Sequence, residues 1–158
     1  MIKGYRIRIY PTKEQEQKMW QHIGACRYIW NYMLDTQQNR YEQGEKHLST
    51  FSMINLLKPL KNDGEHEWLY DVSSASLQRV CCDLGEAYVS FFKKKRGIPK
   101  FKSRKRSKPN FPICAENFYF KDSNMLNIEK VGKVKYKTDF SFPFGKKFKN
   151  IVTHEFPM

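Results

Sequence analysis

Ten cationic side chains lie within 16 consecutive residues that contain no acidic residue. The ten are Lys93, Lys94, Lys95, Arg96, Lys100, Lys102, Arg104, Lys105, Arg106 and Lys108. Lysine and arginine displace the counterions of phosphates, and the interleaved apolar residues, such as Ile98 and Phe101, favour an ordered path along a nucleic-acid backbone. Repulsion between like charges favours the alternative, a solvated and flexible connector. On balance, the pattern predicts a contact with phosphates.

The excess positive charge of the chain comes entirely from its second part. The 158 residues include 29 Lys and Arg against 16 Asp and Glu, a formal net charge of +13. Residues 1–92 hold 11 basic and 11 acidic side chains, so residues 93–158 hold 18 and 5. With 15% aromatic residues, this balance favours DNA or RNA as the partner rather than a small-molecule substrate.

The four cysteines do not form a metal-binding pattern. Cys26, Cys81, Cys82 and Cys114 include no CxxC pair, and no histidine stands at the spacing of a tetrahedral zinc site. We therefore expect no metal and no disulfide. Cys81 and Cys82 are adjacent in a helical pattern, in which one of them should face the core as a small hydrophobic residue.

No run of about 18 apolar residues occurs, and Lys3, Arg6 and Arg8 interrupt the apolar start of the chain. These features predict neither a signal peptide nor a membrane anchor. We expect a cytoplasmic protein with no membrane partner.

The first 92 residues predict one strand followed by four helices. Tyr5, Ile7 and Ile9 alternate with polar residues up to Pro11, and Thr12 with Gln15 forms a capping box. A helix is expected to begin at this capping box, and Gly24 is expected to break or bend it. A tight pair of helices is therefore predicted over residues 12–44.

A third helix is capped by Ser49 or Thr50, and Pro59 ends or kinks it. Trp68 and Leu69 are expected on a loop, before a fourth helix that starts near Ser73 or Ser74 and runs to Phe92. The large aromatic residues of this half are interpreted as core residues: Tyr5, Trp20, Trp30 and Phe91.

After residue 108 the pattern becomes alternating, with turn residues every eight to ten positions. Strands are predicted around Phe118 and Phe120, Leu126 and Ile128, Val134 and Tyr136, and Phe140 and Phe142, the last closed by Pro143 and Gly145. The predicted fold class is therefore α+β, with a strand, four helices and then antiparallel strands that resemble half of a small barrel.

Five blocks along the chain resemble the TnpB (OrfB-type) family of RNA-guided nucleases, which bacterial insertion sequences encode. In family order and at family spacing, the blocks are residues 1–15, 24–31, 68–79, 87–93 and 99–103. The resemblance implies that residues 1–10 form the first strand of a wedge barrel and residues 11–95 a helical, helix-turn-helix-like recognition domain. Residues 96–110 are then a basic linker, and residues 111–158 a partial, oligonucleotide-binding-like wedge barrel.

The resemblance also implies that this chain does not cleave nucleic acid. The family's nuclease centre is a later RNase H-like domain with three metal-binding carboxylates, followed by a zinc-bearing segment, and 158 residues leave no room for either. Residues 93–158 hold only five scattered acidic residues, whereas a two-metal nuclease needs carboxylates that converge. Thr153 to Met158 do not continue the expected barrel, which indicates truncation and an unpaired sheet edge. We expect no catalytic residue and no cofactor.

Four positions correspond, through the resemblance, to the family's contacts with the short duplex motif beside the target. These are Thr50, Ser74, Gln78 and Cys114. The amide of Gln78 is the strongest candidate, because it can donate to and accept from an adenine edge. For Ser74 a simple helix cap is an equally good interpretation.

The leading hypothesis is a TnpB-like protein that binds DNA or its transposon-derived guide RNA without cutting. The alternative is a stand-alone helix-turn-helix regulator that uses the helix pair around Gly24 to bind DNA. Against it, four basic and four acidic residues balance within residues 12–44. An active nuclease would require a second chain that supplies the catalytic domain.

Overall fold

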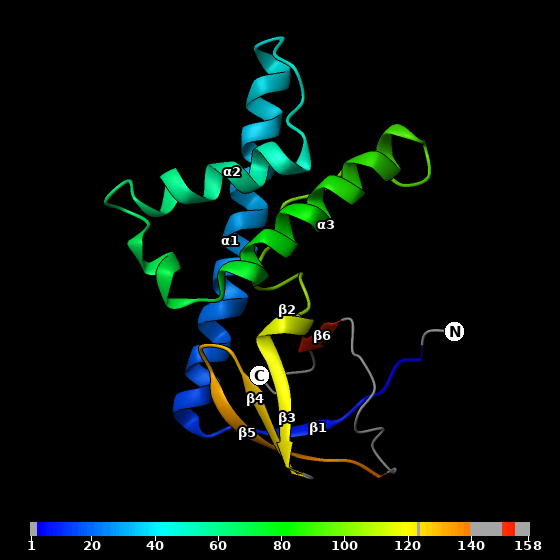
Figure 1. Ribbon diagram of the computed structural model, residues 1–158. Helices are drawn as coiled ribbons and strands as arrows, with labels where there is room; N and C mark the ends of the chain where they lie inside the picture. Colours follow the sequence, from blue (N-terminus) through cyan, green and yellow to red (C-terminus); the bar gives the residue numbers. More distant parts are fainter. Residues whose placement is uncertain (1–2, 123, 140–149, 154–158) are drawn as a thin grey trace.

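The computed structural model describes residues 3–122, 124–139 and 150–153, which form an α+β fold as predicted (Figure 1). The helical elements are α1 (Lys13–Glu42), α2 (Thr50–Lys61), the 3-10 turn η1 (Glu67–Asp71), α3 (Ser74–Phe92) and the 3-10 turn η2 (Ala115–Asn117). The strands are β1 (Arg8–Tyr10), β2 (Phe111–Cys114), β3 (Phe118–Asp122), β4 (Met125–Ile128), β5 (Gly132–Lys137) and β6 (Asn150–Thr153).

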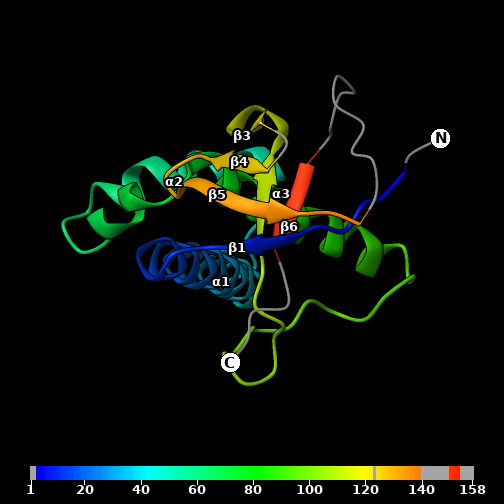
Figure 2. The same cartoon turned by 90° about the horizontal axis from the view of Figure 1, so that it is seen from below.

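Two antiparallel sheets lie below α2 and α3 and beside the first turns of α1 in the view of Figure 1. One has the strand order β1-β5-β4-β3, and β2 pairs with β6 in the other. β1 joins the strands of the second half, with Ile9 opposite Tyr136 (Figure 2). The predicted strands around Phe118, Leu126 and Val134 are confirmed.

Part of the predicted barrel lies outside the described residues, and its first strand differs from the prediction. The strand around Phe140 and Phe142, with its end at Pro143 and Gly145, lies outside the described residues, as does the chain after Thr153. The first strand is shorter than expected, since β1 begins at Arg8. Tyr5 precedes it and is 43% exposed, so its interpretation as a core residue was wrong.

α1 is one continuous helix of 30 residues, where a helix pair was predicted. Thr12 and Gln15 form the predicted capping box at its start. A glycine inside a helix costs about 1 kcal/mol relative to alanine. Buried residues lie on both sides of Gly24, among them Met19 and Ile29, and their burial is worth several times that cost. The described residues therefore hold three α-helices rather than the four predicted.

The remaining helices begin near the predicted residues. Ser49 caps α2 by accepting from the Ser52 N–H at 3.1 Å, and Pro59 lies in the last turn of that helix. α3 begins at Ser74 after the N-cap Ser73. Trp68 and Leu69 lie in η1 rather than in an irregular loop, because Leu69 is fully buried and fixes this segment against the core.

The buried faces of the helices largely follow the predicted stripes. Trp30 is 9% exposed, and Trp20 and Phe91 are partly buried against the core. Cys81 is fully buried while Cys82 is only partly so, which confirms that one of the pair faces the core.

A chain of hydrogen bonds that starts at buried His22 connects the helices to the sheet. His22 Nε2 accepts from the Ser73 N–H at 3.2 Å, so Nδ1 carries the proton and donates to the Lys18 carbonyl at 2.7 Å. The Ser73 hydroxyl donates to Glu129 at 2.8 Å, and Glu129 also accepts from the Asn117 side chain. This polar junction, formed by His22, Ser73, Glu129 and Asn117, joins α1, the start of α3 and the β4–β5 turn.

Alanine at position 24 tests the continuity of α1. A Cβ added at Gly24 meets nothing within 4 Å, so Gly24→Ala should raise the free energy of unfolding by about 0.5–1 kcal/mol. Gly85→Ala is the matched control, because its Cβ would lie 2.0 Å from the Thr50 hydroxyl oxygen and should lower stability. Urea denaturation measures both, and destabilisation by Gly24→Ala would contradict a helix that runs through this position.

The polar junction also predicts acid sensitivity. Burial lowers the pKa of His22 below its ordinary 6.5, although the hydrogen bond to the Lys18 carbonyl opposes this effect. The unfolded chain then binds a proton more readily than the folded chain, so the free energy of unfolding falls as pH drops below about 6.5. Urea titrations at about pH 7.5 and 5.5 should show this loss, and His22→Gln should reduce it. Burial lowers the pKa of His47 as well, so His47→Gln is the comparison. An undiminished loss in His22→Gln would refute this role.

Candidate nucleic-acid interface

Residues 93–110 connect α3 to β2 and contain all ten cations of the basic stretch, which is called the basic segment below. The chain turns sharply after α3, where Lys94 adopts the left-handed conformation with φ of +56°. All ten cationic residues are exposed, whereas Pro99 between them is buried. The segment therefore presents its charge to solvent while part of its backbone is packed against the protein.

Two neighbouring side chains of α1 hold the backbone of this segment. The indole N–H of Trp30 donates to the Lys100 carbonyl at 2.9 Å. The Asn31 amide donates to the Lys102 carbonyl and accepts from the Lys102 N–H, both at 2.8 Å. Together these three hydrogen bonds form the Trp30–Asn31 clamp. A flexible connector, the alternative considered for this stretch, does not describe residues 99–102.

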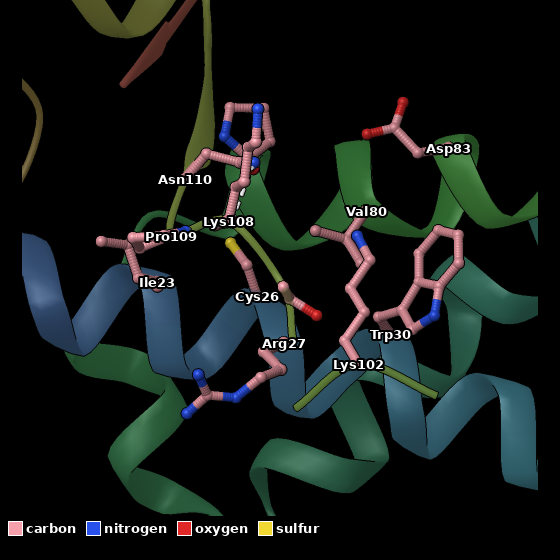
Figure 3. A pocket seen from close by; sticks show the side chains of 12 residues that line it. Ile23, Cys26, Arg27, Trp30, Val80, Asp83, Lys102, Lys108, Pro109 and Asn110 are labelled. Carbon is pink, nitrogen blue, oxygen red and sulfur yellow. Dashed lines mark hydrogen bonds between the residues drawn. The ribbon is translucent and has the colours of Figure 1, made fainter. Parts of the chain in front are cut away.

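The side chain of Lys102 extends this attachment. Its ammonium lies 4.0 Å from the centroid of the Trp30 ring, and Figure 3 shows it running past Trp30 toward α3. Lys102 is exposed as a whole residue, but partial burial of its side chain lowers its pKa, and the negative charge of Asp83 opposes that shift. A cation over an indole contributes about 0.5–2 kcal/mol, the larger value where water is excluded. Lys102 thus already has an aromatic partner within the protein.

Residues 103–107 form a tight turn that projects three consecutive cations. The Ser107 N–H donates to the Ser103 carbonyl at 2.9 Å, and the Ser107 hydroxyl accepts from the Ser103 N–H at 3.2 Å. Arg104, Lys105 and Arg106 occupy the turn, and all three are exposed. This cationic turn begins one residue after the clamped Lys102.

A small cavity of about 50 Å³ separates the basic segment from α1 and α3 (Figure 3). Ile23, Cys26, Trp30 and Val80 are among its lining residues, together with Lys102 and Lys108. Its size suits a few water molecules rather than a nucleobase. Burial raises the pKa of Cys26 to about 12, so this thiol is not a nucleophile at neutral pH.

The structure brings together three of the four residues expected to contact the duplex motif. Ser74 and Gln78 are exposed one turn apart at the start of α3, and the Cys114 thiol lies 3.8 Å from the Ala75 carbonyl. Thr50 lies apart from them, against Gly85, which is seven residues or about 10 Å of helix beyond Gln78.

Ser74 is not the cap of α3, so that alternative was wrong: Ser73 is the N-cap, and Ser74 is the first residue of the helix. Its hydroxyl instead accepts from the Lys61 ammonium at 2.8 Å. Burial lowers the pKa of Lys61, and the charge of Lys130 adds to that shift. A cation from α2 therefore adjoins the surface that Ser74 and Gln78 share.

Sequence reasoning missed the role of Trp30 and Asn31. Trp30 was assigned to the core, which is correct, but its indole N–H is a donor that needs a partner when buried. That requirement was the available signal, and it could not identify a carbonyl 70 residues away.

Within residues 3–122, 124–139 and 150–153, no three His, Cys, Asp or Glu side chains are grouped so that they could bind a metal ion. Over the same ranges, none of the helices has the length and apolar character needed to cross a membrane.

Residues 1–46 match an OrfB-type family described as a helix-turn-helix domain. The chain is 35% identical over 103 residues to an Escherichia coli (strain K12) protein named RNA-guided DNA endonuclease InsQ, covering 65% of this chain and 26% of that protein. It is 26% identical over 123 residues to a Streptomyces pristinaespiralis protein named RNA-guided DNA endonuclease, covering 78% and 31%. The N-terminal part of this chain is homologous to TnpB-like RNA-guided endonucleases.

This chain thus spans about a quarter to a third of the length of those two TnpB-like relatives. It is also 27% identical over 116 residues to virulence protein VsdF of Salmonella dublin, covering 66% of this chain and 95% of that protein. The match to VsdF therefore covers almost the whole length of that protein, unlike the matches to the two longer relatives.

Within the matched residues 1–46, the described residues 3–46 contain β1, α1 and the turn after it. Because α1 is continuous, the described residues do not contain the helix pair around Gly24 that the hypothesis of a stand-alone regulator requires.

Proposed function

We propose that this chain binds nucleic acid without cleaving it, with the basic segment on the phosphate backbone and the start of α3 on a short duplex motif. The observation that carries the proposal is the clamped basic segment, whose cations are exposed on a backbone fixed against α1. Homology to proteins named RNA-guided DNA endonucleases supports DNA as the main partner and a transposon-derived guide RNA as a second one.

Binding without cleavage is proposed for the residues of this chain, and two observations support that part of the proposal. The matches cover 26% and 31% of the two TnpB-like relatives, and the described residues group no three metal-binding side chains. We further propose the division into residues 1–10 and 111–158 as a wedge and residues 11–95 as a recognition domain, which the pairing of β1 with β5 supports. A cytoplasmic location, where DNA and RNA are accessible, is part of the same proposal.

Neutralising the cationic turn tests the phosphate contact. Replacing Arg104, Lys105 and Arg106 together by glutamine should weaken binding to every duplex sequence, because phosphate contacts are independent of sequence. The slope of log affinity against log salt should flatten by about 2–3 units if each side chain meets one phosphate. Fluorescence anisotropy with labelled DNA and RNA measures both quantities. As a control, Lys13, Lys18 and Arg40 of α1 are replaced in the same way, and an equal flattening would refute the assignment.

Gln78 is predicted to distinguish sequences. If its amide bonds to an adenine edge, Gln78→Ala should cost about 1–3 kcal/mol with the preferred duplex and almost nothing with a scrambled one, at unchanged salt dependence. The preferred duplex is first selected from a random pool with the wild-type protein, and competition titrations then compare the two proteins. Gln21→Ala, at an exposed glutamine of α1, is the control. An equal loss of affinity for the preferred and the scrambled duplex would show that Gln78 does not read the motif.

A further inference from the structure

We propose that Trp30 and Asn31 are positioning residues for nucleic-acid binding, and that Lys102 anchors the basic segment to Trp30 instead of binding a phosphate. The inference rests on the proposed function and divides the ten cations into two kinds. Cations of the first kind contact the nucleic acid. Lys102 is of the second kind, which attaches the basic segment to the protein.

The first support is the way Asn31 holds Lys102. Its amide pairs with both the carbonyl and the N–H of the same residue, each at 2.8 Å, as a neighbouring β-strand would. Trp30 adds a bond to the Lys100 carbonyl at 2.9 Å. Since Trp30 is buried and α1 continues on both sides of it, residues 100–102 are held in place before any ligand arrives.

The second support is the position of the Lys102 ammonium. It lies over the Trp30 ring at 4.0 Å, and the nearby Asp83 carboxylate attracts it. Asp83 is itself held by Arg79, with an Arg79 Nε to Asp83 Oδ1 distance of 2.9 Å. To reach a phosphate, the Lys102 ammonium would have to leave the ring and move away from the attraction of the Asp83 carboxylate.

The consequence concerns the cationic turn that follows. Arg104, Lys105 and Arg106 begin two residues after Lys102, so fixing Lys102 limits the directions in which they can point. A fixed segment loses less conformational entropy on binding than a free one, which increases affinity without adding any contact. Loss of the clamp should therefore weaken binding while the number of phosphates neutralised stays the same.

The experiment compares the salt dependence of binding among single variants, by fluorescence anisotropy with a labelled DNA duplex of scrambled sequence. Lys105→Ala should flatten the slope of log affinity against log salt by about 0.9. Lys102→Met and Asn31→Ala should lower affinity about 3- to 10-fold at every salt concentration with the slope unchanged. Lys102→Arg keeps a cation over the ring and should restore affinity. Asn39→Ala is the matched control, since the side-chain amide of Asn39 donates to Asp35 of the same helix.

A flattening by Lys102→Met equal to that of Lys105→Ala would overturn the proposal, because it would show a phosphate contact. Unchanged affinity in Asn31→Ala would overturn it too. Amide hydrogen exchange in the free protein gives a second readout: the Lys102 N–H should exchange slowly in the wild type and in Asn39→Ala, and fast in Asn31→Ala. Rapid exchange in the wild type would refute the clamp. Failure of the wild type to bind DNA or RNA would overturn the proposed function, whereas slow exchange at Lys102 in that protein would still support the clamp.

Discussion

The hydrogen bond between the buried imidazole of His22 and the Ser73 N–H fixes the point where the helices meet the sheet. A buried N–H left without a partner costs about 1–3 kcal/mol, so the start of α3 is strongly constrained to lie beside α1. The Ser73 hydroxyl then bonds to Glu129 of the β4–β5 turn. The position of the proposed motif-reading surface, with Ser74 and Gln78 in the first turns of α3, depends on this constraint.

α1 is the element that both halves of the structure share. Its first turns bond to the sheet through Gln15, whose amide donates to the Lys133 carbonyl at 2.6 Å, and its middle holds the basic segment through Trp30 and Asn31. A helix broken at Gly24 would lose the fixed relation between these two attachments. The continuity of α1 is therefore what holds the basic segment and the sheet in one arrangement.

Similarity to known proteins supports the class of partner, and the geometry of the structure supports the roles of individual residues. The relatives named RNA-guided DNA endonucleases support the proposed nucleic-acid partner, and this chain matches about a quarter to a third of their length. The structure adds a division of labour among the cations, because Lys102 lies on an indole while Arg104, Lys105 and Arg106 project from a turn. Charge density alone assigns all ten cations of the basic segment the same role.

The sequence by itself determined the features that depend on neighbouring residues. The Thr12 capping box, the Ser49 cap, the start of α3, the alternating strands and the concentration of charge after residue 92 were all predictable, because each rests on contacts within a few residues. Tertiary structure decided the rest. It carried α1 through Gly24, since burial along the whole helix outweighs the cost of one glycine. It also joined Asn31 to Lys102 across 71 positions, a pairing that no local pattern specifies because it exists only once α1 and α3 have packed together.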